Sequence, residues 1–458
     1  MTQSSVRVPE FTTAGREVDC ETIVVGGVTY YRQKVSVADT VGLTDTQLRT
    51  TPVTVHADIS DDHLDAFGRL RVSQLQTMLD VQNHYGQLHQ NFVSVIVAGG
   101  TLTDSPVNSS LTLAVDTTSG ASVINRSRRS YYVAGQSHLV ALTGNFGINA
   151  PVALVLRTST SGTPSDARRI EQADWNIDAM GIAGKPNPSG ITVDWSKTQI
   201  IMYDLQWLGV GRVRCFLDID GKQYQIHQFL NANALTEVYM QTPHLPCSYE
   251  IANVGGTQIR KRIGYNDNDD GVFIEQLTTA TSGSMSQICS AVFTEGATPV
   301  AQVKCSISND VTGITCANNV LKHILSIRPA ALFKTRTNKG MCVPLSIEIF
   351  VEGANNAHYI VIEDAVLTTP TWTAHPNVNS MMETCVGAAA AGITSVGHNR
   401  SEGYVTSGNK GGAGAENPDK SYRMQIDPAN APDVLTVAAE GMGGNSVVYA
   451  VITWEEMY

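Results

Sequence analysis

The sequence predicts a mainly β protein with two antiparallel, jelly-roll-like β-sandwiches, an extended N-terminal arm and a short helix. Short runs rich in Val, Ile, Leu and Thr recur about every ten residues, separated by Gly, Asn, Asp, Pro and Ser. Asp220-Gly221 joins two such runs, and Asp-Gly is the typical pair of a tight β-hairpin turn. Charged residues make up only 16% of the 458 residues, which excludes the composition of helical bundles.

The N-terminal region is predicted to contain an arm and a connector. Residues 1–60 are expected to be an extended arm, because their short β-like pieces at 21–25, 28–35 and 53–59 lie between polar turns. Residues 61–92 are expected to be a short helical connector, because apolar side chains from Leu75 to Leu88 are spaced by three and four positions. The N-terminus has no apolar signal region, so no secretory signal is expected.

The two sandwiches follow the connector. The first is expected at 93–283, where strand-like runs begin at 93–97, and the second at 284–458, where the chain closes on a strong apolar run at 446–454. The Gly- and Ala-rich segment 387–420 lies within the second sandwich and is predicted to be a long surface loop.

Composition also excludes several functions. The net charge of −11 offers no basic field for phosphates, so no nucleic-acid binding is expected. No apolar stretch reaches the roughly 18 residues that a bilayer requires, so no membrane span is expected. The eight cysteines form no Cys-x-x-Cys motif and are predicted to be reduced structural residues.

Motifs of catalysis are absent from the sequence. It contains no Gly-x-Ser-x-Gly, phosphate-binding loop or His-Glu-x-x-His, so we assign no catalytic residue and no cofactor and expect no enzyme. His227 alternates with apolar residues and is predicted to be a structural histidine on a strand.

The most charged loop, at 264–271, imitates the start of a calcium loop. Asn266, Asn268 and Asp270 alternate before Gly271, as the first oxygen ligands of such a loop do. Leu277 stands where the closing Glu ligand belongs, so a polar hairpin turn is favoured and calcium stays a weak candidate.

Three groups of residues are predicted to make protein contacts. Because the chain is acidic overall, a salt bridge between subunits or a solvated face is favoured over phosphate binding. Phe67, bracketed by charges, suits a plug into a neighbouring surface. The groups are Phe67 with Arg69 and Arg71, then Arg128 with Arg129, then Arg260, Lys261 and Arg262.

Residues 65–73, Asp-Ala-Phe-Gly-Arg-Leu-Arg-Val-Ser, resemble a segment near the N-terminus of a family of virion structural proteins of tailed bacteriophages. Similar segments follow in the family's order at 132–137, 208–214, 227–233, 239–246 and 261–275, the last containing Lys-Arg-Ile-Gly-Tyr and Asp-Gly-Val-Phe. The resemblance covers roughly 60–375. It implies a particle component of the capsid exterior, neck or tail, and it transfers no catalytic residue.

We therefore expect a homo-oligomeric virion protein that binds itself and other virion proteins of tail, neck or capsid, and that assembles in the host bacterial cytoplasm. The favoured place is the tail or neck, as a sheath, tube-surrounding or fibre-attachment protein. One alternative is a capsid decoration or head-fibre protein. Another is a module that binds a host receptor or glycan, with Trp175, Trp195, Trp207 and Trp372 as candidates. A cell-wall or capsule hydrolase ranks last, because it needs two converging carboxylates.

Overall fold

The structure is a computed structural model, and its contacts divide the chain into two units, Met1–Ile59 and Ser60–Tyr458. It describes residues 3–8, 16–25, 28–33, 75–88, 90–296, 303–387, 392–407, 412–416 and 422–458. In the first unit, β1 (Gln3–Val8), β2 (Arg16–Val25) and β3 (Val28–Gln33) form an antiparallel sheet. Strands thus occupy part of the predicted arm, whereas its β piece at 53–59 lies outside the described residues.

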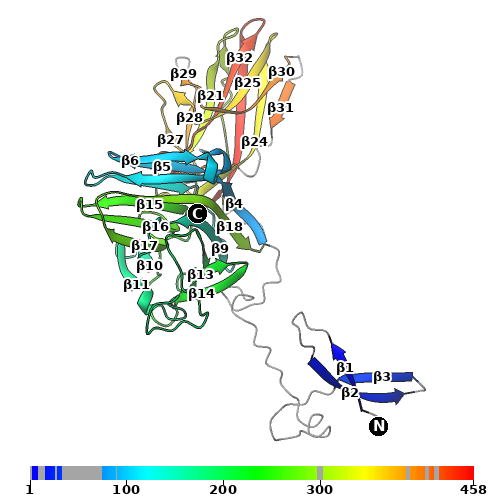
Figure 1. Cartoon of the computed structure of the whole chain (residues 1–458). Coiled ribbons are helices and arrows are strands. Elements are labelled where there is room, and N and C mark those ends of the chain that lie inside the picture. The colour runs from blue at the N-terminus through cyan, green and yellow to red at the C-terminus, as the bar shows by residue number, and fades with distance from the viewer. Residues whose placement is uncertain are drawn as a thin grey trace. The chain divides into compact units, whose positions relative to one another are not determined.

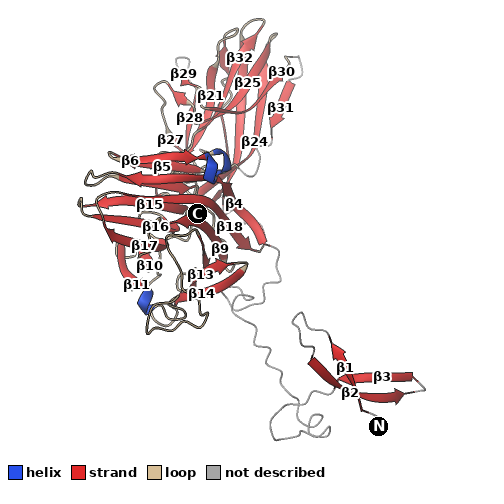
Figure 2. Ribbon diagram, in the orientation of Figure 1, coloured by secondary structure: helices blue, strands red, loops and turns tan. Residues whose placement is uncertain are grey.

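The second unit consists almost entirely of antiparallel strands, as the sequence predicts (Figures 1 and 2). Its described helices are three single 3-10 turns, none long enough to cross a bilayer. They are η2 (Asn83–Tyr85), η3 (Pro106–Asn108) and η4 (Gln172–Asp174).

The first sandwich packs a seven-stranded sheet against an eight-stranded sheet around one apolar core. The seven-stranded sheet has the order β11 (Ser165–Glu171), β10 (Val152–Thr158), β17 (Gly271–Thr279), β16 (Gln258–Asn266), β15 (Cys247–Val254), β8 (Ser122–Ser127), β5 (Phe92–Val97). The eight-stranded sheet has the order β14 (Lys222–Phe229), β13 (Val213–Ile219), β12 (Gln199–Leu205), β9 (His138–Asn145), β18 (Gly283–Glu295), β7 (Ser110–Val115), β6 (Gly100–Ser105), with β4 (Leu75–Gln82) also paired to β18.

The second sandwich encloses its own core between two further sheets. One sheet has the order β19 (Val303–Ser308), β33 (Ser446–Met457), β24 (Met341–Glu352), β31 (Gly412–Glu416), with β20 (Ile314–Cys316) also paired to β33. The other has the order β27 (Thr373–Ala374), β28 (Met382–Val386), β21 (Lys322–Pro329), β32 (Leu435–Met442), β25 (Asn356–Glu363), β30 (His398–Val405). Two small pairs remain, β22 (Leu332–Phe333) with β23 (Arg336–Thr337), and β26 (Val366–Leu367) with β29 (Ile393–Ser395).

The strand β33 illustrates how the sequence pattern builds these sheets. Its Val448, Ala450, Ile452 and Trp454 are spaced by two and are at most 1% exposed, because alternate side chains of a strand point to one face. The predicted hairpin turn is confirmed between β13 and β14. Asp220 and Gly221 both have positive φ, 54° and 80°, which a tight hairpin turn requires.

The structure corrects three expectations from the sequence: one element type, one domain boundary and one loop. The helical connector at 61–92 contains the strand β4, because its side chains at 79 and 81 enter the sandwich core while the backbone pairs with β18. The boundary at 283 cuts off β18, which lies between β9 and β7 of the first sandwich. The loop at 387–420 contains β29, β30 and β31, since small side chains do not prevent backbone pairing.

Candidate functional site

Polar chemistry in the second unit gathers at three places. They are the outer face of the seven-stranded sheet, the turn between β16 and β17, and a cavity between the two sandwiches. Among the described residues, no three His, Cys, Asp or Glu side chains lie close enough together to hold a metal ion. The seven cysteines described are free thiols, six of them buried.

The outer face of the seven-stranded sheet carries a network of buried ion pairs. Glu250 faces Arg262 across β15 and β16, and Arg262 faces Glu275 across β16 and β17. Arg262 Nε donates to Glu275 Oε2 at 2.6 Å, and Arg126 pairs with Glu250 from β8. The guanidinium of Arg262 also lies 4.6 Å from the centre of the Phe273 ring. Arg262, predicted to contact a neighbour, therefore has its partners within this sheet.

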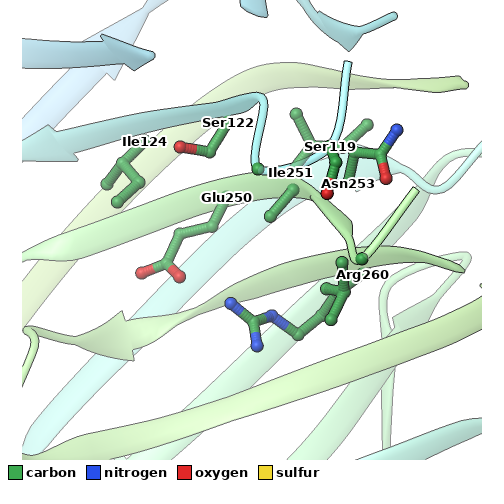
Figure 3. A pocket seen from close by; sticks show the side chains of 11 residues that line it. Ser119, Ser122, Ile124, Glu250, Ile251, Asn253 and Arg260 are labelled. Atoms are coloured by element: carbon green, nitrogen blue, oxygen red, sulfur yellow. The ribbon is translucent and has the colours of Figure 1, made fainter. Parts of the chain in front are cut away.

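A cavity of about 390 Å³ lies beside this network and is lined by Ile124, Glu250 and Arg260 (Figure 3). Burial raises the pKa of Glu250, but the charges of Arg126 and Arg262 outweigh burial and lower it to about 2. Glu250 is therefore ionised at neutral pH and is unsuited to be the general acid of a hydrolase, which needs a raised pKa.

The acidic turn between β16 and β17 holds a lysine ammonium instead of an empty cation site. Lys339 Nζ, from the second sandwich, lies 2.8 Å from Asp267 Oδ2, 3.0 Å from Asp269 Oδ2 and 3.6 Å from Asp270 Oδ2. The turn is the predicted polar hairpin. The turn belongs to the first sandwich and Lys339 to the second, so these ion pairs connect the two sandwiches.

The three residues proposed as calcium ligands do not converge on one point. Asn266 donates its side-chain N–H to Glu250, Asn268 accepts from Arg126 at 2.7 Å, and Asp270 Oδ1 accepts two backbone N–H groups. The alternating spacing that resembles a calcium loop thus serves three separate sets of hydrogen bonds. The sequence cannot reveal this, because all of these partners lie far away along the chain.

Replacing Lys339 with Met is expected to lower the free energy of unfolding by about 2 to 3 kcal/mol. The substitution leaves the carboxylates of Asp267 and Asp270, both buried, without their shared cation. Urea unfolding followed by tryptophan fluorescence measures the loss. Lys304 is exposed on β19, so Lys304→Met is a matched control expected to change stability by less than about 0.5 kcal/mol. Equal losses in the two variants would contradict the role given to Lys339.

Arg128 and Arg129 follow β8 and connect the first sandwich to the second. Arg128 Nη1 pairs with Asp433, and its Nη2 lies 3.2 Å from Glu363 Oε1. Arg129 Nη1 donates to the carbonyl of Ile426 at 2.9 Å. These two arginines were expected to contact a neighbouring subunit or water. The partners found in the structure lie in the same chain, among them Asp433 and Ile426, which are 305 and 297 positions away.

A cavity of about 640 Å³ lies where the two sandwiches meet, and aromatic rings line both of its sides. From the first sandwich, Tyr131 stacks on His244 with 4.8 Å between ring centres. From the second, Phe333 of β22 packs against Tyr458 at 4.9 Å. Trp207 lines it as well, and its indole N–H donates to a backbone carbonyl at 3.1 Å. The cavity is thus built from residues that lie apart in the sequence.

His244 is held neutral in this wall. Burial lowers its pKa to about 3, with a further contribution from the nearby positive charges of Arg129 and Lys339. Its Nδ1 accepts the backbone N–H of Tyr132 at 3.1 Å, which an imidazolium cannot do. This hydrogen bond fixes the orientation of the His244 ring in the cavity wall.

Trp207, one of the four tryptophans considered for a glycan site, lies half-buried after β12 and packs against the first core. The signal for a turn is the Leu208-Gly209 pair that follows it, whose φ values are 34° and 81°. Trp175 and Trp195, in contrast, are core residues with 2% and 1% exposure.

The structure describes only two of the remaining residues that were predicted to make protein contacts. Phe67, Arg69 and Arg71 lie outside the described residues. Arg260 is half-buried beside the first cavity. Lys261 points to the opposite side of β16, where its ammonium donates to the backbone carbonyl at 146, and burial lowers its pKa to about 8.

No protein-family model matches the sequence, and no curated protein matches it. Among solved structures, the exoplasmic domain of VIP36 with bound Ca2+ and Man3GlcNAc is 6% identical, with 50% of this chain and 92% of that chain covered at a TM-score of 0.18. The N-terminal tandem CBM22 domain of Paenibacillus barcinonensis Xyn10C is 8% identical over 84% of this chain and 98% of that chain, at a TM-score of 0.18. A Bacillus subtilis protein with a galectin-like fold is 10% identical over 48% and 95%, at 0.14. Superpositions this poor support no argument about ligands.

Proposed function

We propose that the chain is a structural protein of a tailed-bacteriophage particle, placed in the tail or neck and acting through assembly with copies of itself and other virion proteins. One observation carries the proposal. Segments resembling that family occur in its order from 65–73 to 261–275. Charged residues in the last of these segments hold the molecule together, since Arg262 pairs within one sheet and Asp267 pairs with Lys339 of the other sandwich. Such internal use of charge suits a stable building block.

The edge strand β5 supports self-association. It ends the seven-stranded sheet, and no other described strand pairs with its outer edge. Ile96 and Val97 on it are 48% and 46% exposed. An unpaired edge with exposed apolar side chains is a surface on which another chain can add a strand. A symmetric particle component needs a surface of this kind.

Electron microscopy of particles with a tagged copy tests the location. Label on the tail or neck is expected. Label on capsid faces would instead establish the alternative of a decoration or head-fibre protein, and particles without label would exclude a virion component altogether.

Deletion of residues 1–59 is expected to abolish incorporation into the particle. The chain divides at Ile59, so Ser60–Tyr458 retains both sandwich cores and should stay folded, which circular dichroism can verify. Incorporation is measured by blotting purified particles for the full-length and shortened proteins, made in parallel from the same vector. Equal amounts of both in the particle would refute the role of the N-terminal unit as an anchor.

A second candidate, a receptor- or glycan-binding module, is favoured by a different observation. Trp207 and Phe333 are half-exposed and line the cavity between the sandwiches, where a sugar ring can pack against them.

A further inference from the structure

We propose that the cavity between the two sandwiches binds a saccharide that carries a carboxylate. This inference concerns a ligand and does not depend on where the protein sits in a particle. The cavity is lined by Lys334, Arg336 and Lys339 and by no Asp or Glu side chain. Because Lys339 is paired with the acidic turn, the positive charge that this lining offers comes from Lys334 and Arg336.

Two of these cations are available to a ligand. Lys339 is neutralised by the acidic turn of the first sandwich, so its charge has a partner. Lys334 and Arg336 are exposed, and neither forms an ion pair with any described residue. Lys334 Nζ lies 5.1 Å from the centre of the Phe333 ring, which places positive charge beside an aromatic surface. A guanidinium is suited to bind a carboxylate through two parallel hydrogen bonds.

The rest of the lining suits a sugar ring. A pyranose has an apolar face of C–H groups and an edge of hydroxyls, so it needs both an aromatic surface and hydrogen-bonding side chains. Trp207 and Phe333 supply half-exposed rings, one from each sandwich. Thr242 and Thr337 line the same cavity with hydroxyls. The volume of about 640 Å³ lies within the range of small-molecule sites.

The two loops that carry the rings adopt uncommon backbone conformations. In the hairpin of β22 and β23, Lys334 and Thr335 have φ of 47° and 70°, although neither is glycine. On the other side, Leu208 has φ of 34° directly after Trp207. In the two-residue hairpin, positive φ at both central positions is what the turn itself requires, as at Asp220-Gly221, so these angles are explained without a ligand.

Binding of matched oligosaccharides to the purified full chain tests the inference. The probes are sialyllactose with lactose, and trigalacturonic acid with its neutral methyl ester, measured by calorimetry. At least one acidic member is expected to bind about 10-fold or more tightly than its neutral partner, with affinity that falls as salt increases. Equal binding within both pairs would overturn the inference. So would competition by inorganic phosphate as strong as that by the acidic sugar, because the site would then bind a simple anion.

Arg336→Glu supplies the matched variant. It is expected to weaken binding of the acidic probe by about 10-fold or more, since it replaces a charge-assisted contact with repulsion. Arg336 is exposed in a surface hairpin, so thermal unfolding should be unchanged. Lys304→Glu makes a similar charge change at an exposed position on β19 and should leave binding unchanged. Equal affinity of the Arg336→Glu variant and the unaltered chain would refute the site.

Discussion

Acidification from pH 7 to pH 5 is expected to lower the free energy of unfolding by on the order of 5 kcal/mol. The cause is a set of four buried, neutral histidines in the two sandwiches. Burial lowers the pKa of His138, His227 and His323 to about 4 and that of His244 to about 3. Each one destabilises the folded state by about 2 kcal/mol over this pH interval.

The direction follows from proton uptake. In the unfolded chain these imidazoles regain a pKa near 6.5 and bind protons that the folded chain excludes. Stability is therefore fully present above pH 6.5 and is lost as pH falls toward 4. Asp433 acts in the opposite direction, because burial raises its pKa to about 7, and it offsets roughly one of the histidines.

Urea unfolding at pH 7, 6 and 5 measures the effect. His227→Gln removes one titrating group, and the glutamine oxygen can still accept the Asn176 N–H that His227 Nδ1 accepts now. The pH dependence should become shallower by up to about 1.4 kcal/mol per pH unit. His84→Gln, at an exposed position, should not change it. A stability equal at pH 5 and pH 7 in the unaltered chain would show that the histidines are not buried as described.

Arg128→Met is expected to destabilise the second unit by at least about 3 kcal/mol and to separate the unfolding of the two sandwiches. The methionine fills part of the space but leaves Asp433 and Glu363, both almost fully buried, without this guanidinium. The pairs cross from one sandwich to the other, so their loss weakens the coupling between the two cores.

Two probes distinguish these effects. Far-ultraviolet circular dichroism and tryptophan fluorescence should give coincident urea transitions for the unaltered chain and non-coincident ones for the variant. Arg128→Lys should recover only part of the stability, because a lysine cannot form both contacts at once. Lys185→Met, which breaks an exposed pair with Asp174, should cost less than about 1 kcal/mol. A single unshifted transition in Arg128→Met would mean that the bridge does not couple the sandwiches.

The fold class was predictable from local pattern, but the limits of each element were not. The alternation in the run at 446–454 corresponds to β33, and Asp220-Gly221 corresponds to the turn between β13 and β14. The stripe from Leu75 to Leu88 fits a helix by spacing alone, yet the backbone pairs with β18, and Leu79 and Val81 point into the sandwich core. Pairing with a strand about 200 residues away determines that this segment is a strand. The local sequence pattern carries no information about that partner.

The sequence identifies the charged and aromatic residues of the candidate sites, but it does not identify the residues that they contact. The sequence places Arg128 and Asp270 in charged segments, but it cannot show that Asp433 and Lys339 face them from the other sandwich. The cavity between the sandwiches is likewise formed by segments near positions 131, 207, 244, 333 and 458. Such a site is a property of the packed chain.

The strands that complete the two sandwiches, β18 and β33, have a consequence for biosynthesis. In the first sandwich β18 is an interior strand, and in the second β33 lies between β19 and β24. The ribosome therefore delivers all strands of the first core by residue 295, while the second core lacks an inner strand until residue 457 has been made. At 5–20 residues per second, the nascent second sandwich stays incomplete for roughly 10 to 30 s. A chaperone on the ribosome would therefore act mainly on this second half of the molecule, because the first sandwich already has all its strands.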